Sequence, residues 1–127
     1  MKKALIAFLF MLVSTVTYAH EMTPTYPVLK SSFMDGLLVT QMEIFNKRRD
    51  VEYYELAVFD KDMQPIPFVS SFTVVKLEYL KKIQFDLYIR EADRNKAVYV
   101  CSRSKALTQK ISNTNITSMI CSKFKRE

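Results

Sequence analysis

The clearest indication of the fold class is the segment Val51-Glu52-Tyr53-Tyr54-Glu55-Leu56-Ala57-Val58-Phe59, whose side chains alternate along the chain. Successive side chains of a strand point to opposite faces, so the even-numbered residues from Glu52 to Val58 would share one face and the odd-numbered residues the other. β-Branched and aromatic residues at a period of two are typical of strands. The pattern therefore argues against the main competing interpretation, a helix from Glu43 to Phe59.

Similar segments lie on both sides of this one. Leu37 to Phe45 alternates before it, and after it Ile83 to Ile89 places Ile83, Phe85, Leu87 and Ile89 on the face expected to point inward. Further strand candidates, separated by polar turns, are Met22 to Ser32 (an irregular edge, because of Pro24 and Pro27), Ser71 to Leu77, Ala97 to Cys101 and Ile116 to Phe124. About seven strands at this spacing predict an all-β Greek-key β-sandwich. Ser102 to Asn115 is expected to be a polar loop, with room for a short helix at Ser104 to Lys110.

The first nineteen residues have the features of a secretory signal peptide. Lys2 and Lys3 are followed by an apolar run from Ala4 to Val13, and Thr17-Tyr18-Ala19 offers small residues at the two positions that signal peptidase recognises. We expect cleavage after Ala19 and a periplasmic or secreted mature chain that forms one domain over residues 20–127. The run is short for a membrane span and no second one follows, although an uncleaved anchor is the alternative.

The net charge of the mature chain is modest. Removing Lys2 and Lys3 from 19 basic residues leaves 17 against 13 acidic ones, a net charge of +4. We expect no nucleic acid partner for an exported protein of this charge, whereas an anionic membrane or an acidic protein surface stays open. The basic turn Lys47-Arg48-Arg49 could meet such a partner, but a solvated turn is the simpler interpretation.

The chain offers little for catalysis or metal binding. His20 is the only histidine and is expected at a mobile chain end, which leaves no general base for a nucleophilic serine or cysteine. Cleavage after Ala19 would let the amino group and ring of His20 chelate copper, yet copper sites of this kind need a second histidine. The carboxylates of Glu52, Glu55, Asp60 and Asp62 are expected to be solvated. We therefore expect no enzymatic activity and no metal or cofactor.

Two cysteines, Cys101 and Cys121, remain in a compartment that is expected to be oxidising. A disulfide between them is the natural expectation. It would close a loop of about twenty residues and contribute about 3 kcal/mol of stability. Two buried free thiols are the alternative.

Several segments together resemble a known family. They are the polar turn Asn46 to Asp50 followed by Val51 to Asp60, then Pro65-Ile66-Pro67-Phe68, Tyr88-Ile89-Arg90 and Asp93 to Val100. In this order the chain resembles the amino-terminal domain of periplasmic pilus-assembly chaperones, in a single-domain variant that ends at Glu127. The resemblance implies an immunoglobulin-like fold and a bond between the Cys101 and Cys121 strands, like that of chaperones with a long loop there.

The resemblance also implies a binding mode. In the family, the last strand of this domain pairs with a pilin-like subunit by β-strand addition. The corresponding residues here are Ile116, Ser118 and Ile120 on one face of the last strand, and Lys123, which matches a family lysine that anchors the subunit's terminal carboxylate. The family's partner arginine has no counterpart in Met22 to Ser32. Two alternatives stay open: the isoleucines as ordinary core residues, and a structural or accessory domain of a surface assembly that donates no strand.

Overall fold

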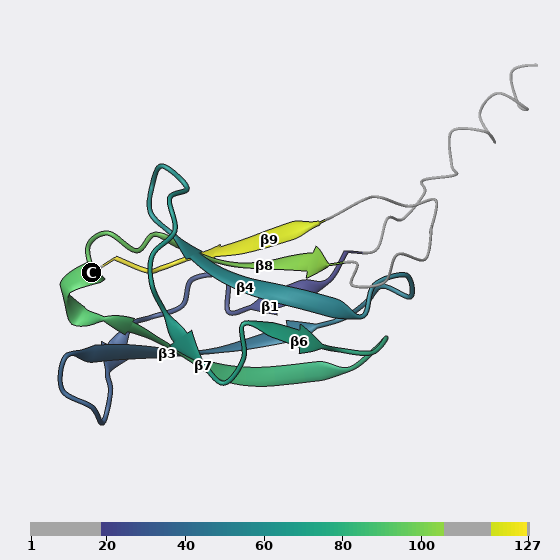
Figure 1. The fold of residues 1–127 in the computed structure, drawn as a ribbon, viewed down its shortest axis with the longest axis horizontal. Helices are drawn as coiled ribbons and strands as arrows, with labels where there is room; N and C mark the ends of the chain where they lie inside the picture. Colours follow the sequence, from purple (N-terminus) through teal and green to yellow (C-terminus); the bar gives the residue numbers. More distant parts are fainter. Residues whose placement is uncertain (1–18, 106–117, 127) are drawn as a thin grey trace, which may run out of the picture.

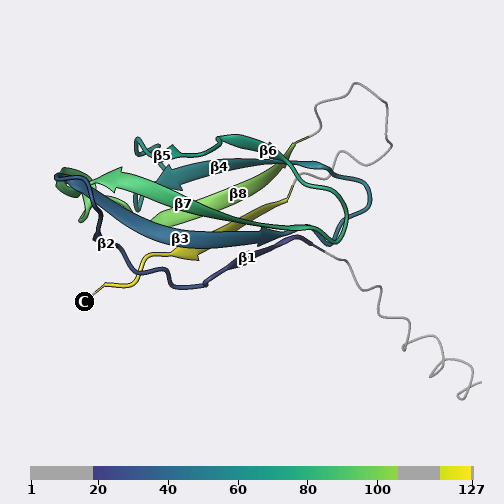
Figure 2. The same ribbon diagram turned by 90° about the horizontal axis from the view of Figure 1, so that it is seen from below.

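The computed structural model describes residues 19–105 and 118–126, which form nine strands in two stacked antiparallel sheets (Figures 1 and 2). The strands are β1 (Glu21–Thr23), β2 (Lys30–Ser31), β3 (Leu37–Phe45), β4 (Tyr53–Phe59), β5 (Val69–Ser70), β6 (Val74–Lys76), β7 (Lys82–Arg90), β8 (Tyr99–Lys105) and β9 (Met119–Lys123), with a 3-10 helix, η1 (Glu91–Asp93), after β7. One sheet has the order β1-β3-β7-β5, with β2 also paired to β3; the other has the order β6-β4-β8-β9. This is an immunoglobulin-like β-sandwich: the alternating segments predicted the sandwich, and the family resemblance implied its immunoglobulin-like form.

The core forms where the alternating faces of the long strands meet. The fully buried residues of these strands are Leu38, Met42 and Ile44 in β3, Tyr54 and Val58 in β4, and Leu87 and Ile89 in β7. Each strand has a period-two burial pattern, because adjacent side chains point to opposite faces. The inward face expected for β7 is confirmed for Phe85, Leu87 and Ile89, while Ile83 is half-buried at the end of the strand.

The amino-terminal segment passes from one sheet to the other. β1 pairs with β3 until Thr23, and the chain then leaves that sheet at Pro24. The next residues run beside β9, where the amide of Lys123 donates to the carbonyl of Thr25 (3.1 Å) and the amide of Lys125 to that of Pro27 (2.9 Å). Because a proline has no N–H, Pro27 cannot return a bond to β9. The irregular edge predicted for this region is confirmed.

The end of β8 is a correction to the sequence analysis. The polar loop was expected to begin at Ser102, but β8 continues to Lys105 because β4 pairs with it along its whole length, as far as Tyr53 opposite Lys105. A helix beginning at Ser104 is therefore wrong. The rest of that loop, with Ile116, lies outside the described residues, as does the predicted signal peptide apart from Ala19.

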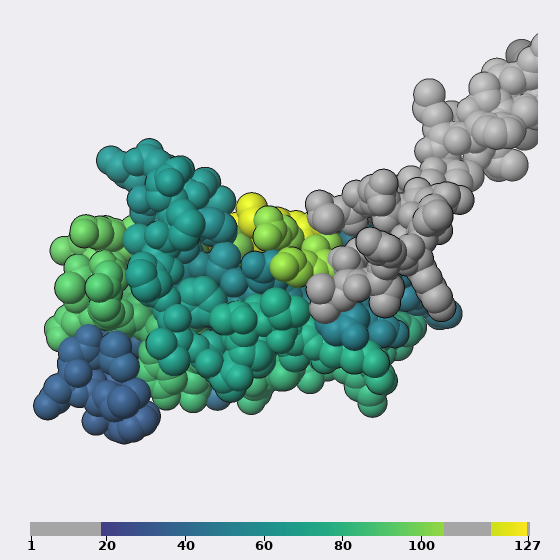
Figure 3. Space-filling view, viewed as in Figure 1, coloured from purple at the N-terminus to yellow at the C-terminus, as the bar shows by residue number. Residues whose placement is uncertain are grey.

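β9 lies at the margin of the molecule. It is the last strand of its sheet, and a few of its atoms are visible beside those of β8 in the space-filling view (Figure 3). The loops that follow β2 and β4 project at the end of the sandwich where the described chain finishes (Figures 1 and 3). Residues 19–105 and 118–126 include no helix with the length and apolar character that a membrane crossing needs.

Candidate functional site

The disulfide fixes the position of β9 against β8. Cys101 and Cys121 are direct partners in the antiparallel register, with Cα atoms 4.1 Å apart, and their sulfur atoms are bonded. The bond lies on the outer face of the sheet, where Cys101 is nevertheless buried and Cys121 is exposed. The predicted disulfide is confirmed, and a slip of β9 relative to β8 would require breaking it.

One edge of β9 is partly open. The amide of Phe124 donates toward β8, to the carbonyl of Val98 (2.9 Å), so the backbone groups of Met119, Cys121 and Lys123 point away from β8. Thr25 to Pro27 bonds to this far edge only from Lys123 onward, and β1 lies beside β9 without pairing with it. Among the described residues, no strand pairs with the outward backbone groups of Met119 and Cys121.

The residues predicted to bind a client have different surroundings. Ser118 lies just before β9 and is half-buried, Ile120 is half-buried against the core, and Lys123 is exposed. Ile120 and Ser122 face inward, while Met119 and Cys121 face outward, as the alternation predicted. The participation of these residues in client binding stays a prediction.

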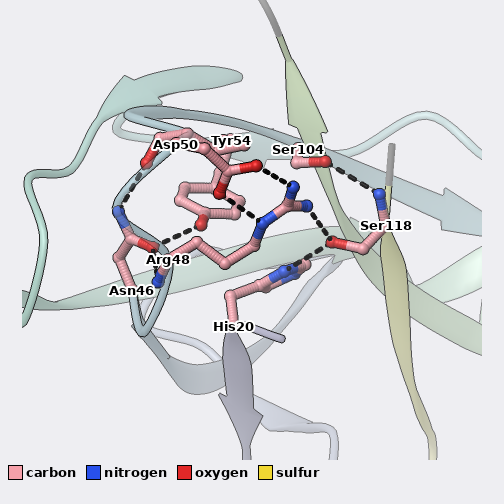
Figure 4. A network of polar contacts seen from close by, with 8 residues as sticks. His20, Asn46, Arg48, Asp50, Tyr54, Ser104 and Ser118 are labelled. Atoms are coloured by element: carbon pink, nitrogen blue, oxygen red, sulfur yellow. Dashed lines mark hydrogen bonds and ion pairs between the residues drawn. The ribbon is translucent and has the colours of Figure 1, made fainter. Parts of the chain in front are cut away.

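A buried polar network lies beneath β9, and its centre is His20 (Figure 4). The ring of His20 is completely buried, 4.5 Å from the ring of Tyr54 between centroids. Its Nε2 lies 2.8 Å from Ser102 Oγ and 3.1 Å from the Ser102 carbonyl, and its Nδ1 lies 3.2 Å from Ser118 Oγ. The expectation of a histidine at a mobile chain end is wrong, because Tyr54 of β4, Ser102 of β8 and Ser118 just before β9 surround this ring.

Arg48 is the second member of the network and corrects the expectation of a fully solvated basic turn. Its guanidinium donates to both carboxylate oxygens of Asp50, at 2.6 and 3.0 Å, and its Nη1 donates to Ser118 Oγ at 3.2 Å. Only 8% of the Arg48 side chain is exposed, so the charge depends on these partners. Of its neighbours in the turn, Arg49 is exposed and lies over the ring of Tyr79.

Asn46 joins the turn to the core. Its side-chain amide donates to the carbonyls of Val51 and Leu77, both at 2.8 Å. Its Oδ1 accepts from the Arg48 amide (2.8 Å) and from the Tyr54 hydroxyl (2.6 Å). No buried side-chain nitrogen or oxygen in the described part of the chain lacks a hydrogen-bond partner. The turn is therefore held by specific polar contacts rather than by apolar packing.

The direction of the hydrogen bonds follows from Arg48, which can only donate. Because Ser118 Oγ accepts from Arg48, its own hydrogen is free to point at His20 Nδ1, and that nitrogen accepts the bond when it carries no proton. The ring proton is left on Nε2, where it is donated to Ser102. The arrangement therefore fits the neutral imidazole in one tautomer.

Electrostatics agree with this geometry. Burial lowers the pKa of His20 below its usual value, the positive charge of Arg48 lowers it further, and the bond to the Ser102 backbone opposes both effects. Hydrogen bonds from Arg48 lower the pKa of Asp50. Burial raises the pKa of Tyr54 to about 12. The network thus holds a neutral histidine and a neutral tyrosine beside one paired arginine.

The copper alternative would need a ring nitrogen of His20 that is open to a metal. Both ring nitrogens instead have serine partners inside the protein. No group of three metal-binding side chains occurs in residues 19–105 and 118–126. Among the acidic residues, Glu55 pairs with Lys105 (2.7 Å) and Arg103 (3.3 Å), and Asp60 caps its own turn by accepting from the amides of Asp62 and Gln64.

The sequence analysis did not predict this network, although two signals for it are present. Ser102 and Ser104 fall on the inward side of β8, and Ser118 continues the inward side of β9, where polar residues need buried partners. Arg48 and Asp50 lie two residues apart in one turn, a spacing at which they can pair. Neither signal indicates that His20 completes the group.

Comparison with known proteins supports the fold and little more. No family model matches the chain, and no curated protein matches its sequence. Among solved structures, the crystal structure of the E. coli chaperone DraB resembles it with a TM-score of 0.62 and 16% sequence identity, over 84% of this chain and 53% of that one. The chain thus spans about half the length of that chaperone. The fold is a chaperone-like β-sandwich.

Proposed function

We propose that this chain is a non-enzymatic protein-binding module that binds its client by β-strand addition at the edge of β9. The observation that carries the proposal is the open edge at Met119 to Cys121, where outward N–H and C=O groups have no strand partner among the described residues. Such an edge is a template for another strand, because the added backbone satisfies these groups. The chaperone-like fold supports the same conclusion.

Two features suit this edge to reversible binding. The disulfide to Cys101 holds β9 in register, so little ordering entropy is lost when a client strand adds. The side chain of Met119 is 46% exposed and adaptable, and so offers apolar contact to clients of different shape. Backbone pairing would then provide affinity, and alternate side chains would provide selectivity.

The client that fits best is a pilin-like or other surface-assembly subunit. Lys123 is exposed beside the edge and could pair with the terminal carboxylate of such a subunit. Residues 1–19 would act as the signal peptide that sends the chain to the periplasm or outside the cell, leaving residues 20–127 as the binding domain. Ile116, which lies outside the described residues, remains among the proposed binding residues.

A second candidate function rests on the covered half of β9. Thr25 to Pro27 occupies the edge from Lys123 onward, and Ile120 packs against the core of its own sandwich. A strand that only completes its own sandwich and binds no client would have both features as well. The alternative is therefore a structural or accessory domain of an envelope or surface assembly that donates no strand.

Hydrogen exchange separates the two functions. In the oxidised mature protein, the outward amides of Met119 and Cys121 should exchange quickly, whereas those of Ile120 and Ser122, which face β8, should exchange slowly. Adding an extract of envelope proteins from the producing cells should slow exchange at Met119 and Cys121 alone. No protection by the extract, or slow exchange at all four amides from the start, would favour the structural domain.

A pair of substitutions at one position tests the role of the backbone. Met119→Pro removes an outward N–H without removing a bond to β8, so it should keep the fold and lose the protection that the extract gives to Cys121. Met119→Ala removes most of the side chain but keeps the N–H, and should retain that protection. Equal loss in both variants would mean that the side chain, not strand addition, mediates binding.

A further inference from the structure

Ser118 is the point at which the buried network reaches β9. Its amide donates to Ser104 Oγ (2.8 Å) and its carbonyl accepts from the Ser104 amide (2.9 Å), which ties it to the end of β8. Its hydroxyl meets Arg48 Nη1 and His20 Nδ1, both at 3.2 Å. Figure 4 shows Ser118 between these two side chains, which come from distant parts of the sequence. The start of the edge strand is therefore held both by β8 and by His20 and Arg48, which lie outside its own sheet.

This arrangement favours a neutral His20. The Ser118 hydroxyl accepts from Arg48 and donates to the bare Nδ1 of His20. A proton on Nδ1 would face that hydroxyl hydrogen and would place an imidazolium one oxygen atom away from a guanidinium. The Ser118 hydroxyl would then have to turn its hydrogen away from His20 and accept from two positively charged groups at once.

The surroundings of His20 provide nothing that would stabilise a positive ring. The β3–β4 turn contributes Arg48, whose charge is repulsive, and Asp50, whose carboxylate is already occupied by Arg48. β4 contributes Tyr54, which stays neutral across the ordinary pH range, and β8 and the start of β9 contribute serines. If the leader is removed after Ala19, the new amino group of His20 adds a further positive charge.

We propose that His20 is a proton-sensitive anchor for the start of β9: the neutral ring holds Ser118, and protonation releases Ser118 to Ile120. The disulfide sets the limit of this release, because Cys121 stays bonded to Cys101 whatever the state of His20. Arg48 acts as a positioning residue that sets which state Ser118 favours. The proposal deepens the proposed function, since Met119 belongs to the edge assigned to the client, but its test needs no client and so succeeds or fails separately.

The direction of the pH effect follows from linkage. The unfolded chain takes up a proton on His20 near its ordinary pKa of 6.5, whereas the folded chain resists protonation. The stabilising contribution of neutral His20 is therefore complete above pH 6.5 and is lost as the pH falls through the lowered pKa of the folded state. The effect on β9 should appear in the same acidic window.

The test is an NMR titration of the tag-free secreted protein, whose amino terminus is first established by mass spectrometry. His20 is the only histidine in the sequence, so its ring signal is unambiguous. We expect a midpoint below 6.5, with the amide signals of Ser118, Met119 and Ile120 shifting or broadening at the same midpoint while that of Leu87 does not change. A midpoint at or above 6.5, a ring that titrates without any response of β9, or loss of all signals together would overturn the proposal.

Two variants sharpen the test. His20→Gln keeps one donor and one acceptor for Ser102 and Ser118 but cannot titrate, so its β9 signals should be independent of pH in this window. Arg48→Gln keeps a donor for Ser118 but removes the positive charge, so the His20 midpoint should move upward relative to the wild-type protein. Where Arg48→Gln fails to fold, Asp50→Asn replaces it and should move the midpoint downward. A response of β9 that persists in His20→Gln would contradict the proposal.

Discussion

Polar side chains on the two faces of β8 have different surroundings. On the inner face, Ser102 and Ser104 contact His20 and Ser118 inside a network in which buried groups have fixed partners. On the outer face, Arg103 and Lys105 share the carboxylate of Glu55. A buried group that loses its partner keeps the full cost of desolvation, whereas an exposed one turns to water. The comparison predicts that similar substitutions will have large effects on one face and small effects on the other.

The largest effect is expected from Asn46→Ala. Asn46 is completely buried, and its loss leaves the carbonyls of Val51 and Leu77, the Tyr54 hydroxyl and the Arg48 amide without their partner. Since each stranded buried group costs a few kcal/mol at most and some will rearrange, the free energy of unfolding should fall by about 4 kcal/mol. Denaturant titration measures this change. Asn95→Ala, at an exposed asparagine, is the control, and an equal loss there would contradict the comparison.

An intermediate effect is expected at alkaline pH. Burial raises the pKa of Tyr54 to about 12 from its ordinary value of 10, so the folded state keeps a proton that the unfolded state loses. The contribution of Tyr54 to stability is thus complete below pH 10 and is lost as the pH rises toward 12. Unfolding free energies measured across this range should fall more steeply for the wild-type protein than for Tyr54→Phe. If stability fell equally with pH in the wild-type protein and in Tyr54→Phe, the Tyr54 hydroxyl would not be buried and hydrogen-bonded as the structure shows.

The smallest effect is expected on the outer face, from Glu55→Gln. Its side chain is 28% exposed, and exposed ion pairs contribute little, so the free energy of unfolding should change by about 0.5 kcal/mol. The hydrogen bond from Lys105 lowers the pKa of Glu55 below 4.5, so this contribution exists above that pH and disappears as the pH falls. Moderate salt should reduce it further. If Glu55→Gln lowered the free energy of unfolding as much as Asn46→Ala, the predicted difference between the inner and outer faces would be wrong.

Most of the fold could be predicted from the sequence, because burial of one strand face leaves a local pattern. β3, β4 and β7 follow from alternation within nine or fewer residues each, and the irregular first segment follows from its prolines. The extension of β8 was missed, since Ser102 to Lys105 is polar and resembles a loop. β5 was also missed, because two residues are too few to show a period.

The candidate site was harder to predict, because its parts are distant in sequence. The register of Cys101 and Cys121 could be anticipated from a pair of cysteines in neighbouring strands. By contrast, His20 lies 82 positions from Ser102 and 98 from Ser118, and Arg48 lies 70 positions from Ser118. The polar residues of the turn indicated only that Arg48 would be exposed to solvent. The pairing of β1 with β3, which sets Glu21 opposite Phe45, places His20 beside the turn that carries Arg48 and beneath Ser118.

The disulfide has a consequence for engineering. It joins residues 20 positions apart, and the part of the sequence between Lys105 and Ser118 lies inside the closed loop. Because the pairing of β8 with β9 and the Cys101–Cys121 bond already hold the two strands in register, sequence inserted there should leave them aligned. This interval is therefore a natural place to graft an epitope, a protease site or a fluorescent reporter beside the β9 edge.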